Sequence, residues 1–283
     1  MRWGRRREVV RDTFDMAGWP GFSRVDGLVL RRGHTDVVPM AVFEDAIPTD
    51  AERQRILAHG YGLHVAGVPV AHRDLRFLRD FMGLTALSVT GVEYDTRPVG
   101  DITTLEDLSL SVFDAPETDL SALASLTSFA GAWEPNRSVF EIPALERASF
   151  HDVEANDLPE LPAQLLELEL ASAPRIRSIH GARDGDPALR RLSITRARLF
   201  DLSSLTTFRH LAVLALSDVT RLVGTAALAD IPLRELGLLN CRHIADAAEL
   251  ARLKDVRATV TGRLATSVGE IRTGCEPPWE YLP

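Results

Sequence analysis

The most constraining feature of the sequence is an apolar pattern, L-x-x-L-x-L, that returns at nearly constant spacing. With some substitutions, it begins at Leu84, Leu105, Leu126, Leu145, Leu165, Leu189, Leu211, Leu233 and Leu253. The last two apolar positions of each unit are two residues apart, so they share one face of a short strand. Because successive units begin only 19 to 24 residues apart, the chain must turn back after each strand. We therefore expect parallel strands stacked side by side.

The segments between these strands are also repetitive. "DLSALASL" (119–126) and "DLSSLTTF" (201–208) are near copies. Each begins with Asp, a favourable first residue for a helix or turn, and then places apolar residues three apart, which suits a short helical or 3-10 turn. In "DAAELARL", Asp246 and Glu249 have the spacing of a capping box. A single unit cannot bury its leucines, whereas a stack of nine can.

These units resemble a known family. Residues from about 61 to 262 look like a bacterial leucine-rich-repeat domain, and "TDLSALASLTSF" is similar to the short repeats of internalin-like proteins. The resemblance implies an α/β solenoid with a parallel β-sheet on its concave side and short helical or 3-10 segments on its convex side. For function it implies only a scaffold, because such repeats bind many different partners.

The ninth position of the family's repeat usually carries an inward-facing Asn or Cys that serves the backbone of the turn. Cys241 fits this position, and we interpret it as a buried structural thiol. Other residues stand at the ninth position of the remaining units: Val92, Phe113, Glu134, Val153, Ala173, Ala197, Val219 and Thr261. These residues cannot form an asparagine ladder, so we expect a less regular curve. We also expect "HGARDGDPA", before Leu189, to bulge as a loop.

The two ends of the chain do not follow the repeat. We interpret residues 1–60 as an α+β N-terminal cap, with two strands around a turn at Gly33 and a helix that a capping box of Thr49 and Glu52 begins and Gly60 ends. The solenoid, 61–262, then opens with a strand in "GLHVAG" and a helix in "HRDLRFLRDFMG". We expect 263–283 to fold over the last repeat as a capping tail. The alternatives are a separate N-terminal domain with its own partner and a docking peptide in the tail.

Composition excludes several classes of protein. The formal net charge is −8, which argues against binding to nucleic acid, and acidic residues directly follow the short basic run "RWGRRR". Two cysteines are too few for a disulfide framework. The basic start lacks the apolar core of a signal peptide, and no apolar run is long enough to span a bilayer. We therefore expect a soluble, cytoplasmic protein that binds neither nucleic acid nor membrane.

Catalytic and metal-binding motifs are not found in the sequence. It contains no zinc-hydrolase, serine-hydrolase or nucleotide-binding signature. His59 and His64 lie five residues apart across a turn, which is a poor metal pair, and Asp184 and Asp186 lack the spacing of a calcium loop. Too few residues follow the repeats to make a cysteine-dependent domain around Cys275. We therefore predict no catalytic residue, no metal and no cofactor.

The strand residues that alternate with the leucines should face outward on the concave side. The candidates for a binding surface there are Trp133, Arg147, His151, Asp152, Glu167, Glu169, Arg191 and Arg196. In one interpretation, the arginines and glutamates pair across neighbouring strands into a self-satisfied ladder of surface ion pairs. In the other, they form an interaction patch, with Trp133 exposed at its edge as a binding hot spot.

These observations favour a non-enzymatic module that binds a protein partner on the concave face. An acidic scaffold of this kind suits an inhibitor or immunity protein that masks a basic partner, or an adaptor. The alternative is an enzyme or small-ligand-binding protein with its site in the N-terminal region.

Overall fold

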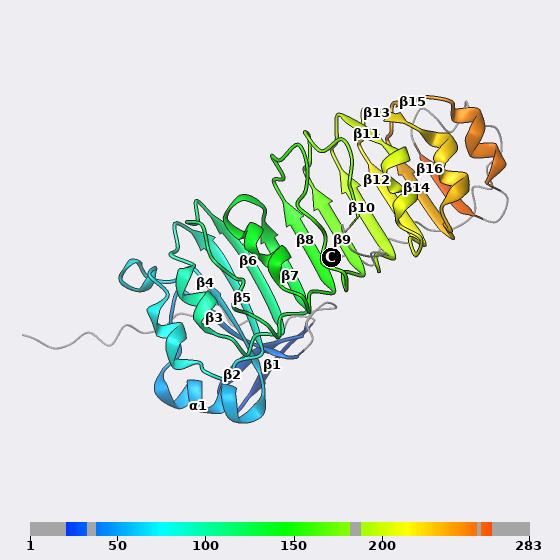
Figure 1. Cartoon of the computed structure of the whole chain (residues 1–283). Helices are drawn as coiled ribbons and strands as arrows, with labels where there is room; N and C mark the ends of the chain where they lie inside the picture. The colour runs from blue at the N-terminus through cyan, green and yellow to red at the C-terminus, as the bar shows by residue number, and fades with distance from the viewer. Residues whose placement is uncertain (1–20, 33–37, 182–187, 254–255, 262–283) are drawn as a thin grey trace, which may run out of the picture.

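One large sheet dominates the computed structural model, which describes residues 21–32, 38–181, 188–253 and 256–261. Over these residues the sheet has 13 strands that lie side by side along an elongated body (Figure 1). Its strands, in spatial order, are β1 (Phe22–Val25), β2 (Leu28–Arg31), β3 (Met40–Glu44), β4 (Gly62–Ala66), β5 (Ala86–Val92), β6 (Asp107–Phe113), β7 (Ser128–Ala132), β8 (Arg147–His151), β9 (Glu167–Ala171), β10 (Arg191–Thr195), β12 (Val213–Ser217), β14 (Glu235–Leu239) and β16 (Arg257–Thr261). From β3 onward all neighbours are parallel.

Short helical turns connect these strands. The chain has one described α-helix, α1 (Asp50–His59), and the 3-10 turns η2 (Val70–His72), η3 (Arg76–Asp80), η4 (Arg97–Asp101), η5 (Glu134–Glu141), η6 (Leu202–Thr207), η7 (Thr225–Asp230) and η8 (Ala247–Arg252). A second, three-stranded parallel sheet joins β11 (Leu199–Asp201), β13 (Arg221–Val223) and β15 (His243–Ile244). This arrangement is a leucine-rich-repeat solenoid, so the predicted fold class is confirmed.

The register of the parallel strands builds the core. Leu192, Leu214 and Leu236 are aligned on neighbouring strands, and each is at most 2% exposed. The leucines that begin the repeats are buried in the same way from Leu84 to Leu233, and Leu253 packs partly buried against them. The repeats therefore share one continuous hydrophobic core.

In many of the repeats a left-handed residue decides where the strand ends. In five repeats the eighth residue has φ between 54° and 58°: Asp152, Ser172, Arg196, Asp218 and Asn240. Such a residue bends the chain, and the ninth residue then points into the core. Val153, Ala173, Ala197, Val219 and Cys241 are buried accordingly. The prediction for Cys241 is confirmed, and burial raises the pKa of its thiol to about 11.

The strands β5 and β6 end differently. They have seven residues each, whereas β7 has five, and the left-handed residues come later, at Glu93 and Asp114. The ninth residues, Val92 and Phe113, are consequently still within the strands and face outward, 48% and 61% exposed. The expectation of an inward-facing ninth position is wrong for these two repeats, and also for Glu134, which is exposed.

Buried hydroxyl groups form hydrogen bonds between neighbouring repeats. Thr96 and Thr118 are each 1% exposed, and their hydroxyls bond to one another between neighbouring repeats. The Ser138 hydroxyl then donates to the Thr118 carbonyl at 3.0 Å and accepts from the Leu120 N–H at 2.9 Å. These bonds satisfy backbone groups that would otherwise be buried without partners.

Aspartates begin many of the returning segments. The Asp119 carboxylate accepts from the Ser121 N–H at 3.0 Å and the Ser121 hydroxyl at 2.6 Å, and these bonds lower the pKa of Asp119. Asp201 bonds to Ser203 in the same way. The predicted 3-10 turn forms after Asp201, whereas 119–126 contains only isolated turns.

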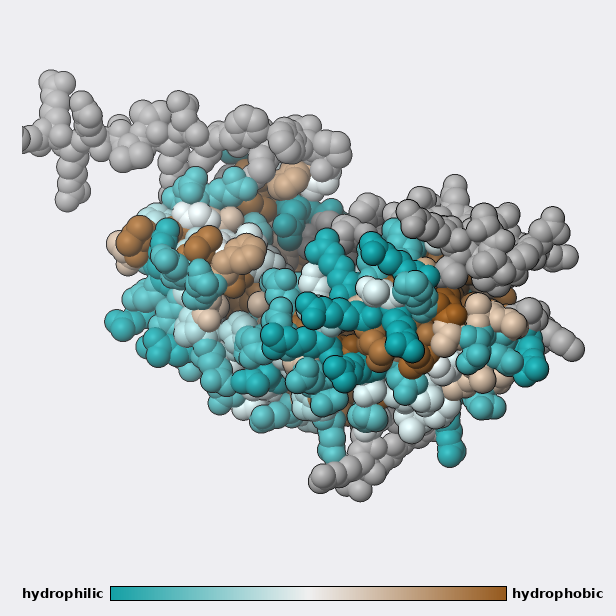
Figure 2. Space-filling view, turned by 90° about the horizontal axis from the view of Figure 1, so that it is seen from above, coloured by the Kyte–Doolittle hydropathy of each residue, from teal (hydrophilic) through white to brown (hydrophobic). Residues whose placement is uncertain are grey.

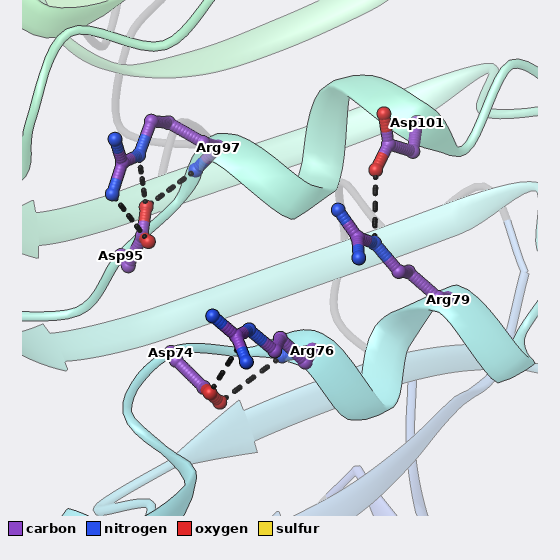
Figure 3. Close-up of polar contacts among 6 residues, drawn as sticks. All are labelled: Asp74, Arg76, Arg79, Asp95, Arg97 and Asp101. Carbon is purple, nitrogen blue, oxygen red and sulfur yellow. Dashed lines mark hydrogen bonds and ion pairs between the residues drawn. The ribbon is translucent and has the colours of Figure 1, made fainter.

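In two earlier repeats, an arginine stands two residues after the aspartate, where Ser121 and Ser203 stand in the later ones (Figure 3). The Arg97 guanidinium donates to Asp95 at 2.7 and 2.8 Å, and these side-chain bonds lower the pKa of Asp95. Asp74 and Arg76 form the corresponding pair at 3.3 Å. An ion pair of 3.1 Å between Arg79 and Asp101 then links η3 to η4.

The capping box predicted in "DAAELARL" is wrong. Asp246 has a left-handed backbone, with φ 56°, and its side chain makes no capping hydrogen bond. Glu249 instead pairs with Arg252 at 2.6 Å. The segment forms the 3-10 turn η8.

The N-terminal region extends the large sheet. The capping box of Thr49 and Glu52 is confirmed, and so is the left-handed Gly60 that ends α1. The strands β2 and β3 flank the predicted turn at Gly33, which itself lies outside the described residues. The sequence analysis missed β1, although Asp26 and Gly27, with φ 50° and 82°, are the usual signal for a tight hairpin turn.

Other expectations for the ends have different outcomes. "GLHVAG" forms β4 as predicted, whereas "HRDLRFLRDFMG" forms the 3-10 turn η3 in place of a longer helix. Residues 182–187 of the predicted loop, the predicted tail at 263–283 and Cys275 lie outside the described residues. The domain boundaries stay a prediction.

We expect Leu214→Ala or Leu236→Ala to lower the free energy of unfolding by about 2 to 5 kcal/mol, because each leaves a cavity in the shared core. Ser217→Ala, on the outer face of β12, is the matched control and should change it by less than about 0.5 kcal/mol. Urea denaturation followed by circular dichroism measures both. Equal stability of all variants would contradict the observed register.

We expect Thr118→Val to destabilise the protein by about 1 to 3 kcal/mol, because it leaves the buried Thr96 hydroxyl without its partner. Thr90→Val removes an exposed hydroxyl from β5 and serves as the control. The melting temperatures of the two variants should differ clearly, and a Thr118→Val protein as stable as Thr90→Val would rule out a structural role for the hydroxyl pair.

Candidate protein-binding surface

The outer face of the large sheet consists of the strand side chains that alternate with the buried leucines. The parallel register places them in rows that cross the strands. The middle row consists mainly of small residues: Ser88, Ser109, Ala130, Ser149, Glu169, Ser193, Ala215, Gly237 and Thr259. A partner's backbone can come close to such a surface, and Glu169 is the one charged side chain in this row.

Four predicted residues gather on β8, β9 and β10. Glu167 lies between Arg147 and Arg191 in the register. Its carboxylate is 4.0 Å from the Arg191 guanidinium, and both side chains are well exposed, 50% and 39%. Glu169 accepts a hydrogen bond of 3.1 Å from Ser149. The Arg147 side chain forms no ion pair with any described residue, so the ladder of mutual pairs is incomplete.

The other predicted polar residues lie at the carboxyl ends of these strands. His151 is on the outer face, and its Nδ1 is 3.1 Å from the Asp152 carboxylate. The Arg196 guanidinium donates to the Ser172 hydroxyl at 3.1 Å. Asp152 and Arg196 are the left-handed residues that end β8 and β10, so they form the edge of the face and not its centre.

The expectation of an exposed Trp133 is wrong. Trp133 is 1% exposed and packs edge-on against Phe150, with ring centroids 5.1 Å apart, and against Phe140 at 5.7 Å. It follows the short strand β7, and its helical backbone, with φ −66° and ψ −58°, turns it inward. Trp133 therefore belongs to the core and cannot contact a partner.

Phe113, and not Trp133, is an exposed aromatic residue among those that the structure describes, 61% accessible to solvent. The alternation Leu108, Leu110, Val112 continues through β6 up to Phe113, and that period of two places Phe113 outward. The pattern was therefore visible in the sequence. It predicts an outward-facing Phe113 only if β6 continues for two residues beyond the usual strand length.

Among the described residues, His64 and Ser88 form a part-buried pair that resembles part of a catalytic arrangement. His64 Nδ1 is 2.9 Å from the Ser88 hydroxyl across β4 and β5. A serine nucleophile also needs backbone N–H groups directed at the developing oxyanion. Ser88 lies inside a strand that is paired on both sides, so the neighbouring N–H groups serve the sheet. The pair is thus not sufficient for an active site.

The described residues offer no group of three or more His, Cys, Asp or Glu side chains placed to hold a metal ion. Within the same residues, no helix has the length and apolar character needed to cross a membrane.

Comparisons with known proteins were made at the levels of sequence and fold. No protein-family model matches the chain, and no curated protein matches its sequence. Among solved structures, the chain is similar to an internalin from Listeria monocytogenes, with 13% identity and a TM-score of 0.44. The match covers 77% of this chain and 72% of the internalin.

We expect Trp133→Ala to lower the free energy of unfolding by about 3 to 5 kcal/mol, because it empties the aromatic cluster under β7 and β8. Phe113→Ala removes an exposed aromatic ring from the neighbouring strand and should cost less than about 1 kcal/mol. Chemical denaturation of both variants tests the assignment. A Trp133→Ala protein as stable as the wild type would contradict the burial of Trp133 in the core.

Proposed function

We propose that this protein is a non-enzymatic binding module of the cytoplasm that holds a protein partner on the outer face of its sheet. The contact would centre on β8, β9 and β10, with Arg147, Glu167, Glu169 and Arg191 on the face. His151, Asp152 and Arg196 would contribute at the edge.

The observation that carries this proposal is the incomplete pairing of the charged cluster. Glu167 and Arg191 are only 4.0 Å apart and remain exposed, and Arg147 has no charged partner among the described residues. Loosely paired, exposed charges give an interface electrostatic specificity and fast association. The small side chains of the middle row let a partner approach the backbone between these charges.

The overall charge supports one kind of role. With a formal net charge of −8, the protein attracts a basic partner over long range. This charge suits an inhibitor or immunity protein that masks a basic surface, or an adaptor that recruits one. The low number of cysteines agrees with a reducing compartment.

The decisive experiment is an affinity capture from lysate of the native host with three baits. They are the wild type, a Glu167→Arg/Glu169→Arg variant of the outer face, and a Glu141→Arg/Asp230→Arg variant. Glu141 and Asp230 are exposed residues at the ends of η5 and η7, so the control changes the net charge equally but on the returning segments. Circular dichroism checks that all three baits fold.

We expect the wild type and the control to capture the same partner protein in similar amounts. The outer-face variant should capture at least tenfold less of it, because reversed charges repel a complementary partner. Quantitative mass spectrometry of the captured proteins gives the ratio. Equal capture by the three baits would show that the charged cluster is not part of the binding surface.

A further inference from the structure

The ends of β5 and β6 form a ledge on the outer face. Both strands have seven residues, whereas β4 before them and β7 after them have five. Val92 and Phe113 are paired in register at the tip of the ledge. The neighbouring strands are too short to cover them, so the two apolar side chains lie exposed beside one another.

This exposure is unusual for the described surface. Only five large hydrophobic residues are exposed there, and Val92 and Phe113 are the pair among them that the sheet register places side by side. The face in Figure 2 is mainly hydrophilic, with hydrophobic residues gathered in a few places between the polar ones. Contiguous exposed apolar side chains rimmed by polar groups mark interaction sites, whereas single ones are ordinary. Phe113 is 61% exposed and has the exposed Val92 beside it.

An acidic residue follows each member of this apolar pair in the chain. Glu93 directly follows Val92, and its N–H donates to the Phe113 carbonyl at 2.9 Å. Asp114 directly follows Phe113. The N–H of Thr118 donates to the Pro135 carbonyl at 2.7 Å, which brings the segments that carry Glu117 and Glu134 side by side.

The charges of these carboxylates are only partly balanced. Arg73 lies 3.3 Å from Glu93, and Arg137 lies 3.8 Å from Glu134. The carboxylates of Asp114 and Glu117 are exposed and contact no cationic group of the described residues. The ledge is therefore an apolar pair within a negatively charged rim.

We propose that the ledge is a second docking surface, separate from the charged cluster on β8 to β10. Its occupant is a protein segment in which arginine or lysine residues flank an exposed apolar side chain. The apolar side chain covers Phe113 and Val92, and the basic groups meet Asp114 and Glu117. This inference rests on the proposed function only in taking the protein to be a binding module.

The negative charge of the rim disfavours other kinds of occupant. A second copy of the ledge would place carboxylates against carboxylates, which is repulsive. Nucleic acids and anionic membranes would be repelled for the same reason. A basic protein segment with an apolar side chain is the occupant that complements both the charges and the apolar pair.

The test uses the full-length protein and a phage-displayed library of random 12-residue peptides. Enriched peptides are synthesised, and their dissociation constants are measured by fluorescence anisotropy at two salt concentrations. The ledge variants are Phe113→Ser and Asp114→Arg/Glu117→Arg. Their controls are Met82→Ser, which alters a side chain that is also 61% exposed but precedes β5, and Glu141→Arg/Asp230→Arg.

We expect the enriched peptides to combine basic residues with an aromatic or aliphatic residue. Their affinity should fall at least tenfold in both ledge variants and less than twofold in both controls. Raising the salt concentration should weaken binding to the wild type, because the exposed charges are then screened. Circular dichroism of each variant separates loss of the surface from loss of the fold.

Three outcomes would overturn the proposal. They are no enrichment over selection on the Phe113→Ser protein, enriched peptides without basic residues, and unchanged affinity in the ledge variants. Peptides lost only with Glu167→Arg/Glu169→Arg would overturn the ledge and leave the proposed function intact.

Discussion

The stacking of each repeat's leucines on those of the next repeat is the interaction on which the whole structure depends. Leu192, Leu214 and Leu236 are buried only because their strands are parallel and in register. A shift of one residue within a strand would turn its leucines toward solvent. The extension of β5 and β6 by two residues continues the alternation at the strand ends and leaves the register of the core unchanged.

The same constraint places function on the outer face. Inward positions must match the neighbouring repeat, whereas outward positions touch no other layer and are free to carry charge or remain small. The cluster on β8 to β10 and the ledge on β5 and β6 use this freedom differently. The first combines charges of both signs with small residues, and the second combines an exposed apolar pair with carboxylates.

Two aromatic residues show how closely exposure depends on the end of a strand. Trp133 directly follows β7, at the eighth position of its repeat, and Phe113 is the last residue of β6, at the ninth position of the preceding repeat. The chain leaves β7 early, and Trp133 turns onto Phe150. It continues through β6, and Phe113 projects from the outer face. The hydrophobicity of a residue near the end of a strand is thus a poor guide to its burial.

Sequence alone determined the elements whose cause is local. The buried leucines, the caps of α1 and the inward position of Cys241 follow from the alternation of side chains, from a capping box and from the repeat. Only the tertiary structure decided the burial of Trp133, the exposure of Phe113, the backbone of Asp246 and the pairing of Glu167 with Arg191. Except for the backbone of Asp246, each of these depends on what the neighbouring repeat offers: an aromatic pocket, a strand edge that is too short, or an opposite charge within reach. Such contacts join residues about 20 positions apart, and local patterns carry no record of their geometry.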